Sequence, residues 1–204
     1  MAYSLEEEQE INKLKDWWQE NGKTVVAAAI LGIAAWGGWQ YWQKHQINQI
    51  MTASMQYDSI VSATEQDPVA KKAQVEQFVQ AHDKTSYAVF ALFDEAKGLV
   101  NKQDFAGAEN VLQQALAQSQ DDVLTSLGAL RLGAVQFQLG KFDDALASLT
   151  QVKNAAFEAR KQLLIGDIQL AKADRDAAKA AFEAAQKAGN SAEQQMAELK
   201  LNSL

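Results

Sequence analysis

The apolar residues of this chain form one continuous run, which is followed by a long region of helical periodicity. The run, Val25 to Trp42, reads VVAAAILGIAAWGGWQYW and holds no charged residue and one polar side chain, Gln40. At about 1.5 Å per residue, its 18 residues span roughly 27 Å as a helix, just enough for a thin hydrocarbon core. This pattern predicts a single transmembrane helix, which we place at residues 24–43.

The residues that flank the run predict its orientation. Aromatic side chains of the kind that favours the membrane–water boundary lie at its C-terminal end: Trp36, Trp39, Tyr41 and Trp42. The lysines before it are Lys13, Lys15 and Lys23, and only Lys44 follows closely. Because lysine-rich flanks remain in the cytoplasm, we expect a cytoplasmic tail at residues 1–23 and a domain at residues 44–204 across the membrane.

Two other interpretations of the run are open. A cleaved signal peptide would need small residues near its end, where the bulky run Trp39–Trp42 stands. A buried core helix of a soluble protein would seldom end in three tryptophans and a tyrosine. An uncleaved membrane anchor therefore fits the sequence best.

Small residues within the run predict a face for helix packing. Ala28 and Gly32 are four residues apart, as are Ala34 and Gly38. Such pairs let a second membrane helix approach closely, although alanine and glycine are also common in anchors for no such reason.

Helical periodicity continues on both sides of the anchor. A short amphipathic tail helix is expected to start at the capping box Ser4-Leu5-Glu6-Glu7. After the anchor, apolar residues keep a helical period, so the anchor helix is expected to continue out of the membrane to about Thr64. Asp67 and Pro68 then predict an N-cap and the first position of another helix, which ends near His82. The apolar face of that helix is Val75, Phe78 and Val79.

The remainder of the domain contains an internal repeat in three copies, at residues 87–120, 124–155 and 157–188. Small residues fix its register: Ala108, Ala145 and Ala178 are each followed four residues later by Leu112, Leu149 and Phe182, and preceded twelve residues earlier by Ala96, Gly133 and Gly166. This pattern resembles tetratricopeptide repeats, pairs of antiparallel helices of about 34 residues that cross closely at small residues. We therefore predict an all-α fold, in which a transmembrane helix precedes a tetratricopeptide-like α-solenoid.

The end of such an array needs a cover for its exposed stacking face. A last helix at residues 192–201 is expected to provide it. Ser191 and Gln194 are the predicted capping residues of this helix.

The sequence contains no recognisable catalytic or cofactor motif. It has no cysteine and lacks zinc-binding and nucleotide-binding motifs, so we expect no enzyme activity, no cofactor and no metal site. His45 is expected at the membrane interface, and His82 at a helix C-terminus. The acidic pairs Asp121-Asp122 and Asp143-Asp144 are interpreted as helix caps or solvated residues. A net charge of −7 disfavours nucleic acid as a partner.

The first helices of the three repeats predict a surface for a protein partner. Its expected residues are Phe90, Phe93, Lys97, Asn101, Leu127, Leu130, Phe137, Gln138, Arg160, Leu163 and Leu170. This surface is unusually apolar, and two interpretations remain open. It is either a core covered by another helix, such as residues 47–64 or the last helix, or an exposed groove for another protein.

Short motifs around the anchor, together with the repeat layout behind it, carry a family resemblance. The motifs are Glu20-Asn21-Gly22-Lys23, Ile30-Leu31-Gly32, Gly38-Trp39, Tyr41-Trp42 and His45-Gln46. The chain resembles the YfgM family of bacterial inner-membrane proteins over nearly its whole length. The resemblance implies a periplasmic repeat domain beside the SecYEG translocon, a partnership with the membrane-anchored chaperone PpiD, and a role in passing emerging polypeptides to periplasmic chaperones.

Three functions are compatible with an anchor and a partner surface. The first is a translocon-associated scaffold or chaperone accessory. The second is an anchored adaptor that restrains an envelope-stress or signalling component. The third is an import receptor that faces the cytosol, which would require the opposite orientation.

Overall fold

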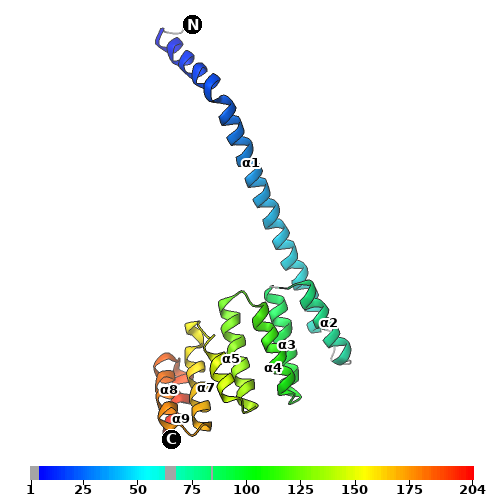
Figure 1. Cartoon of the computed structure of the whole chain (residues 1–204), viewed down its shortest axis with the longest axis vertical. Helices are drawn as coiled ribbons and strands as arrows, with labels where there is room; N and C mark the ends of the chain where they lie inside the picture. The colour runs from blue at the N-terminus through cyan, green and yellow to red at the C-terminus, as the bar shows by residue number, and fades with distance from the viewer. Residues whose placement is uncertain (1–4, 63–67, 84) are drawn as a thin grey trace. The chain divides into compact units, whose positions relative to one another are not determined.

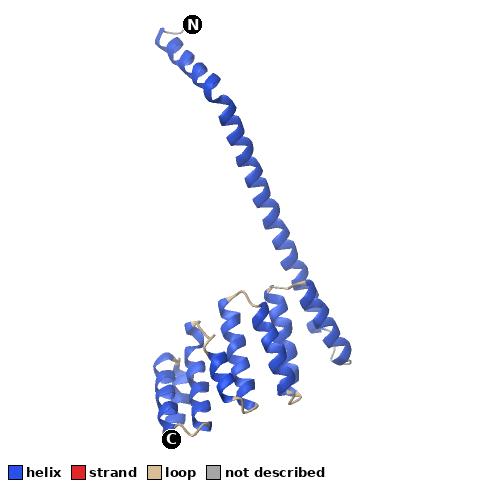
Figure 2. Cartoon of the chain, viewed as in Figure 1, coloured by secondary structure: helices blue, strands red, loops and turns tan. Residues whose placement is uncertain are grey.

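The structure is a computed structural model that describes residues 5–62, 68–83 and 85–204. Within these ranges every regular element is a helix, and the helices are joined by short loops (Figure 2). The expectations for Ser4, Thr64 and Asp67 lie outside the described residues. The chain divides into two compact units, residues 1–49 and residues 50–204.

Helix α1, Leu5–Ser62, contains the anchor with its expected helical continuation, and also the tail helix, which the sequence pattern treats separately. The expected tail helix, the anchor and the helix beyond the anchor are continuous in it. The only proline of the chain, Pro68, lies after α1, and the glutamate, glutamine and lysine residues of the tail are strong helix formers. Nothing in the local sequence therefore ends the tail helix before the apolar run begins.

Six helices form the three predicted pairs, and we call the first and second helix of each pair helix A and helix B (Figure 1). The pairs are α3 (Ser86–Asn101) with α4 (Phe105–Gln118), α5 (Asp122–Gln138) with α6 (Phe142–Leu149), and α7 (Glu158–Ala171) with α8 (Arg175–Ala188). Ala108, Ala145 and Ala178 are each 0% exposed, which confirms the predicted register.

The glycines of helix A lie directly against side chains of helix B. A Cβ atom added to Gly133 would lie 3.0 Å from Cγ of Leu149, and one added to Gly166 would lie 2.7 Å from Cζ of Phe182. Since real Cβ atoms essentially never come closer than 3.0 Å, these pairs of helices can cross this closely only because the positions lack side chains.

The turns within the three pairs share one backbone conformation. Gln103, Gly140 and Ala173 occupy equivalent positions with φ of 62°, 71° and 62°. This left-handed conformation is strained for residues that carry a Cβ atom, so only the second turn uses the residue best suited to it.

The second repeat differs from its neighbours in the length of its helix B. Helix α6 has 8 residues, whereas α4 and α8 have 14 each. The chain after α6 is held by the buried Ser126, whose Oγ accepts hydrogen bonds from the backbone N–H groups of Lys153 (3.2 Å) and Asn154 (3.1 Å). A short 3₁₀ helix, Ala155–Phe157, then leads into α7.

The array is closed at its C-terminal end by α9, Ser191–Asn202, which packs on α8. Its capping box is formed by Asn190 and Glu193, so the predicted pair of Ser191 and Gln194 is wrong by one residue. The Asn190 side chain accepts hydrogen bonds from the N–H groups of Ala192 and Glu193, while the Glu193 carboxylate accepts one from Asn190 N–H. Asn190 takes this role because it has the extended backbone that an N-cap requires, whereas Ser191 is already helical.

The first repeat is covered by the end of α1 and by α2, Pro68–Ala81. Tyr57 of α1 donates a hydrogen bond to Asp94 of α3 over 2.6 Å, and its ring lies 6.3 Å from that of Phe90. Gln56 is hydrogen-bonded to His82, just after α2, over 2.8 Å. The predicted apolar face of α2 is buried: Val75, Phe78 and Val79.

Candidate functional site

The residues of the predicted partner surface on α3, α5 and α7 differ in how deeply they are buried. Phe93 is buried. The half-buried members are Leu127, Leu130, Phe137, Leu163 and Leu170, and the exposed members are Phe90, Lys97, Asn101, Gln138 and Arg160. The structure therefore divides the predicted residues among several environments.

Other helices contact both ends of this surface. At the α3 end, the ring of Phe90 lies against Tyr57 of α1. At the α7 end, Arg160 Nε donates a hydrogen bond to the Glu193 carboxylate of α9 over 3.0 Å. Between these two contacts lies a group of residues on α3 and α5. We call it the α3–α5 surface, and its members are Phe93, Lys97, Leu130, Arg131 and Ala134.

Arg131 is the chemically distinctive residue of the α3–α5 surface. Its guanidinium carbon lies 4.5 Å from the centroid of the Phe93 ring, a cation–π contact. Burial lowers the pKa of Arg131, and the negative charge of Asp94 opposes this shift. Arg131 is nevertheless an exposed residue, and its guanidinium, which carries several N–H donors, lies over the Phe93 ring.

Arg131 lacks the ion pair that several other cations of the repeats make. Lys141, Arg160, Lys172 and Lys200 each lie within 3.0 Å of a carboxylate oxygen. Among the described residues, no carboxylate oxygen lies within 4.0 Å of a guanidinium nitrogen of Arg131, the distance that defines an ion pair. The exposed guanidinium of Arg131, beside the half-buried Leu130, can receive a carboxylate from another molecule.

The anchor unit is exposed at every residue from Lys23 to Gln49. Trp36, Trp39 and Trp42 are 66%, 58% and 52% exposed, and a Cβ atom added to Gly32 or Gly38 would meet nothing within 4 Å. Its small-residue pairs, Ala28 with Gly32 and Ala34 with Gly38, are therefore open to a neighbour, as an anchor surrounded by lipid or by another helix would be. Helix α1 has the length and apolar composition needed to cross a membrane.

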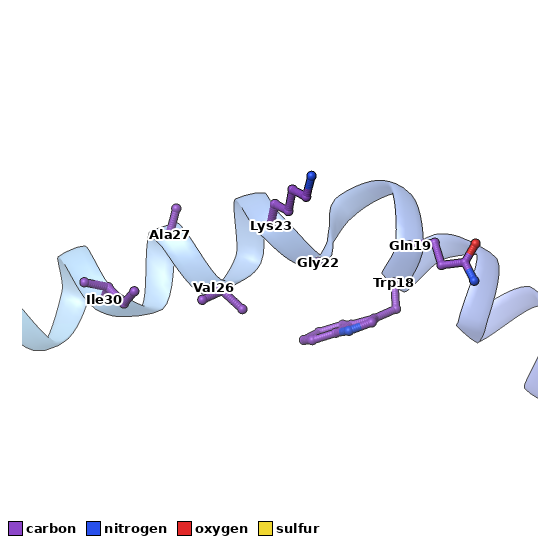
Figure 3. Close-up of a pocket in the computed structure, with 7 residues that line it drawn as sticks. All are labelled: Trp18, Gln19, Gly22, Lys23, Val26, Ala27 and Ile30. Carbon is purple, nitrogen blue, oxygen red and sulfur yellow. The ribbon is translucent and has the colours of Figure 1, made fainter.

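A shallow hollow lies on α1 where the apolar run begins. Figure 3 shows the Trp18 ring alongside the turn of Gly22, with Lys23 and Val26 further along the helix. A Cβ atom added to Gly22 would lie 3.3 Å from this ring, so the glycine lets the indole lie close to the backbone.

Comparison with known proteins assigns these features to a family. A family model described as a tetratricopeptide repeat-like domain matches residues 15–204. An ancillary SecYEG translocon subunit of Haemophilus influenzae is 63% identical over 204 residues, which are 100% of both chains. The chain belongs to the family of ancillary SecYEG translocon subunits. The Escherichia coli K12 member is 33% identical over 97% of this chain and 96% of its own.

The fold of this family member also has a solved counterpart. The MamA RS-1 ArsTM double mutant superposes with a TM-score of 0.54 at 16% sequence identity, covering 74% of this chain and 83% of the MamA chain. At such low identity the likeness concerns the helical-repeat fold alone.

In this member of the translocon-subunit family, the structure adds a polar chain that sequence reasoning missed. The buried Glu109 of α4 accepts hydrogen bonds from Lys141 Nζ (2.6 Å) and from Gln136 Nε2 (3.2 Å). Gln136 Oε1 accepts one from Ser148 over 2.7 Å, so the first two repeats are joined by a chain of polar contacts. The hydrogen bond from Lys141 is the main cause that lowers the pKa of Glu109, and burial opposes it.

Several of the other singled-out polar residues have structural partners. Asp121 caps α5 through hydrogen bonds from the N–H groups of Val123 and Leu124. Asp143 pairs with Lys172 over 2.5 Å. His45 is hydrogen-bonded to Gln49 over 3.0 Å. Within the described part of the chain, no three histidine or acidic side chains cluster as metal ligands would.

Arg131 was also missed, because a single arginine on a helix usually lies on a solvated face. The signal that points to it is its register. Arg131 occupies in α5 the place that Asp94 occupies in α3, 37 residues earlier, one residue after the apolar Leu130 and Phe93.

Proposed function

We propose that this protein is a non-catalytic, membrane-anchored scaffold of the Sec translocon that binds a protein partner through its α3–α5 surface. The observation that carries the proposal is similarity to ancillary SecYEG translocon subunits along the entire chain, anchor and repeats included. The helical-repeat fold supports it, because such arrays act by presenting extended surfaces to other proteins.

The proposed orientation places the N-terminus in the bacterial cytoplasm and the repeats in the periplasm, with α1 crossing the inner membrane once. Three lysines before the apolar run against one closely after it support this arrangement. In spheroplasts, added protease should digest the domain beyond Gln46, whereas complete protection behind an intact inner membrane would require the opposite orientation.

The proposed partners are SecYEG and the membrane-anchored chaperone PpiD. Through them the protein would assist the transfer of translocated polypeptides to periplasmic chaperones, and nascent or unfolded periplasmic proteins are proposed as direct clients. The α3–α5 surface supports this role, since the half-buried Leu130 beside the exposed guanidinium of Arg131 can accept a mixed apolar and acidic segment.

Photo-crosslinking in vivo tests the surface directly. A benzophenone amino acid at Lys97 or Ala134, both exposed, should give adducts with PpiD or a Sec subunit. The same probe at Lys179, exposed on α8, serves as the control and should give far less adduct. Equal adduct from the control, or no translocon component captured from either test position, would contradict the assignment.

Arg131 provides a second test at the same surface. Arg131→Gln should weaken capture of the partner while the domain stays folded, and Arg131→Lys should restore it only in part because lysine lacks the planar fork. If capture falls only in variants that also lose their cooperative thermal unfolding, the α3–α5 surface is core rather than a partner site.

A further inference from the structure

Beyond the membrane, α1 carries a second apolar face that the repeats do not cover. The segment from Ile50 onward belongs to the same compact unit as the repeats, and it packs on them through the buried Ala53 and the half-buried Tyr57 and Ile60. A different set of large apolar side chains on this segment is exposed: Ile50 at 49%, Met51 at 60%, Met55 at 62% and Val61 at 53%. We call these four residues the outer α1 face.

The outer α1 face is a continuous stripe. At 3.6 residues per turn, its four residues fall within an arc of about 140° that adjoins the arc packed on the repeats. Large exposed apolar residues gathered in this way mark interaction sites rather than ordinary surface. Two of them are methionines, whose flexible side chains adapt to varied partners.

Lipid cannot cover most of this face. Met51, Met55 and Val61 lie 9, 13 and 19 residues after Trp42, the last tryptophan of the aromatic belt. Along a helix these separations correspond to roughly 14, 20 and 28 Å beyond the membrane boundary that such a belt marks. A protein surface is therefore needed to remove them from water.

Charge favours a different protein over a second copy. Lys44 falls within the same arc, at the end of the segment nearer the membrane. Two copies anchored in one bilayer and related by a two-fold axis along the membrane normal would oppose Lys44 to Lys44. A different helix can instead place an acidic residue near Lys44.

We infer that the outer α1 face binds the juxtamembrane helix of a second, different membrane-anchored protein, which leaves the bilayer alongside α1 and packs on Ile50, Met51, Met55 and Val61. This inference rests on the proposed membrane anchoring of α1. It is separate from the α3–α5 surface, which takes a partner segment on the repeats. Sharing a bilayer raises the effective concentration of the two helices, so a face with few large residues can suffice.

The inference is tested in the full-length chain in native membranes, with a benzophenone amino acid at Val61 as the probe. The expected adduct joins this position to a peptide that begins within about 20 residues of a membrane-spanning segment in another protein, since that length of helix reaches about 30 Å. Met51→Gln combined with Met55→Gln should lower the adduct yield roughly tenfold or more, because two apolar contacts are lost. The control variant, Lys179→Gln with Glu183→Gln on α8, changes exposed residues alone and should leave the yield unchanged.

Three results would overturn the inference: adducts with lipid alone, adducts with a second copy of this chain, or no adduct. A yield that the paired methionine substitutions leave unchanged would also overturn it. Co-purification of SecYEG is measured in the same membranes, so that its persistence without the Val61 adduct rejects this inference and leaves the proposed function standing. Extraction of the full-length chain from membranes by carbonate would instead reject the anchoring on which both depend.

Discussion

Replacing Gly166 with alanine is expected to destabilise the third repeat by about 2 kcal/mol. The new Cβ atom would lie 2.5 Å from Cδ1 of Phe182, whose side chain is 0% exposed. Because the enclosed ring cannot swing aside, α7 and α8 must separate. Overpacking of this kind costs roughly 1–3 kcal/mol, and the clash places Gly166→Ala at the upper end of that range. The better helix propensity of alanine returns up to about 1 kcal/mol.

A compensating substitution separates this explanation from a general intolerance of the site. The first repeat pairs Ala96 with Leu112 in the same register, so Gly166→Ala combined with Phe182→Leu recreates a pair that the fold already accommodates. The double variant should be more stable than Gly166→Ala alone. We expect a coupling free energy of roughly 1.5 kcal/mol or more between the two positions.

The measurement is urea unfolding of residues 50–204, followed by far-ultraviolet circular dichroism. The matched control is Gly98→Ala on α3, where an added Cβ atom meets nothing within 4 Å. This control should gain about 0.5–1 kcal/mol from helix propensity. Strictly additive effects of Gly166→Ala and Phe182→Leu, or a Gly166→Ala variant as stable as the control, would refute the reasoning.

Three further predictions follow from the repeats and the anchor. Ala145→Leu, at a fully buried crossing, should cost roughly 1–3 kcal/mol of unfolding free energy, whereas Ala147→Leu, at an exposed position, should cost much less; equal melting temperatures would reject the register. The hydrogen bond from Lys141 lowers the pKa of Glu109 in the folded state. The ionised Glu109 therefore stabilises the fold at pH values above the unfolded-state pKa of about 4.5, and this stabilisation is lost as the pH falls through the lower folded-state pKa. Glu109→Gln should therefore unfold at lower urea concentration than the parent at pH 7, and a gap that does not narrow in acid would contradict this assignment. Replacement of Val25–Trp42 by an unrelated anchor should weaken co-purification of the membrane partner, and undiminished co-purification would show that the anchor is a passive tether.

The repeat register could be predicted from the sequence because close helix crossings leave few choices of residue. Ala108, Ala145 and Ala178 are small in every copy, and each is fully buried. The helix-A residue twelve positions earlier is alanine or glycine in every copy, and Gly166 lies against the largest of the helix-B side chains, Phe182. Such local constraints are visible in a single sequence.

Contacts between distant residues could not be predicted in the same way. Glu109 and Lys141 are 32 residues apart, and each alone has the character of a surface residue. Their pairing depends on how the first two repeats stack. The different environments of the predicted partner-surface residues likewise depend on tertiary packing, because α1 contacts Phe90 and α9 contacts Arg160. Neither contact follows from helical periodicity.

The short length of α6 affects how the repeat array should partially unfold. In stacked repeats, cooperativity depends on the interface between neighbours, and a second helix of 8 residues offers the third repeat less surface than one of 14. The weakest junction in the array should therefore lie between α6 and α7. Backbone amides of α7, α8 and α9 should exchange with deuterium through a shared partial unfolding, while those of α3 and α5 remain protected. The half of the domain that carries the α3–α5 surface would then keep its shape while the far end fluctuates.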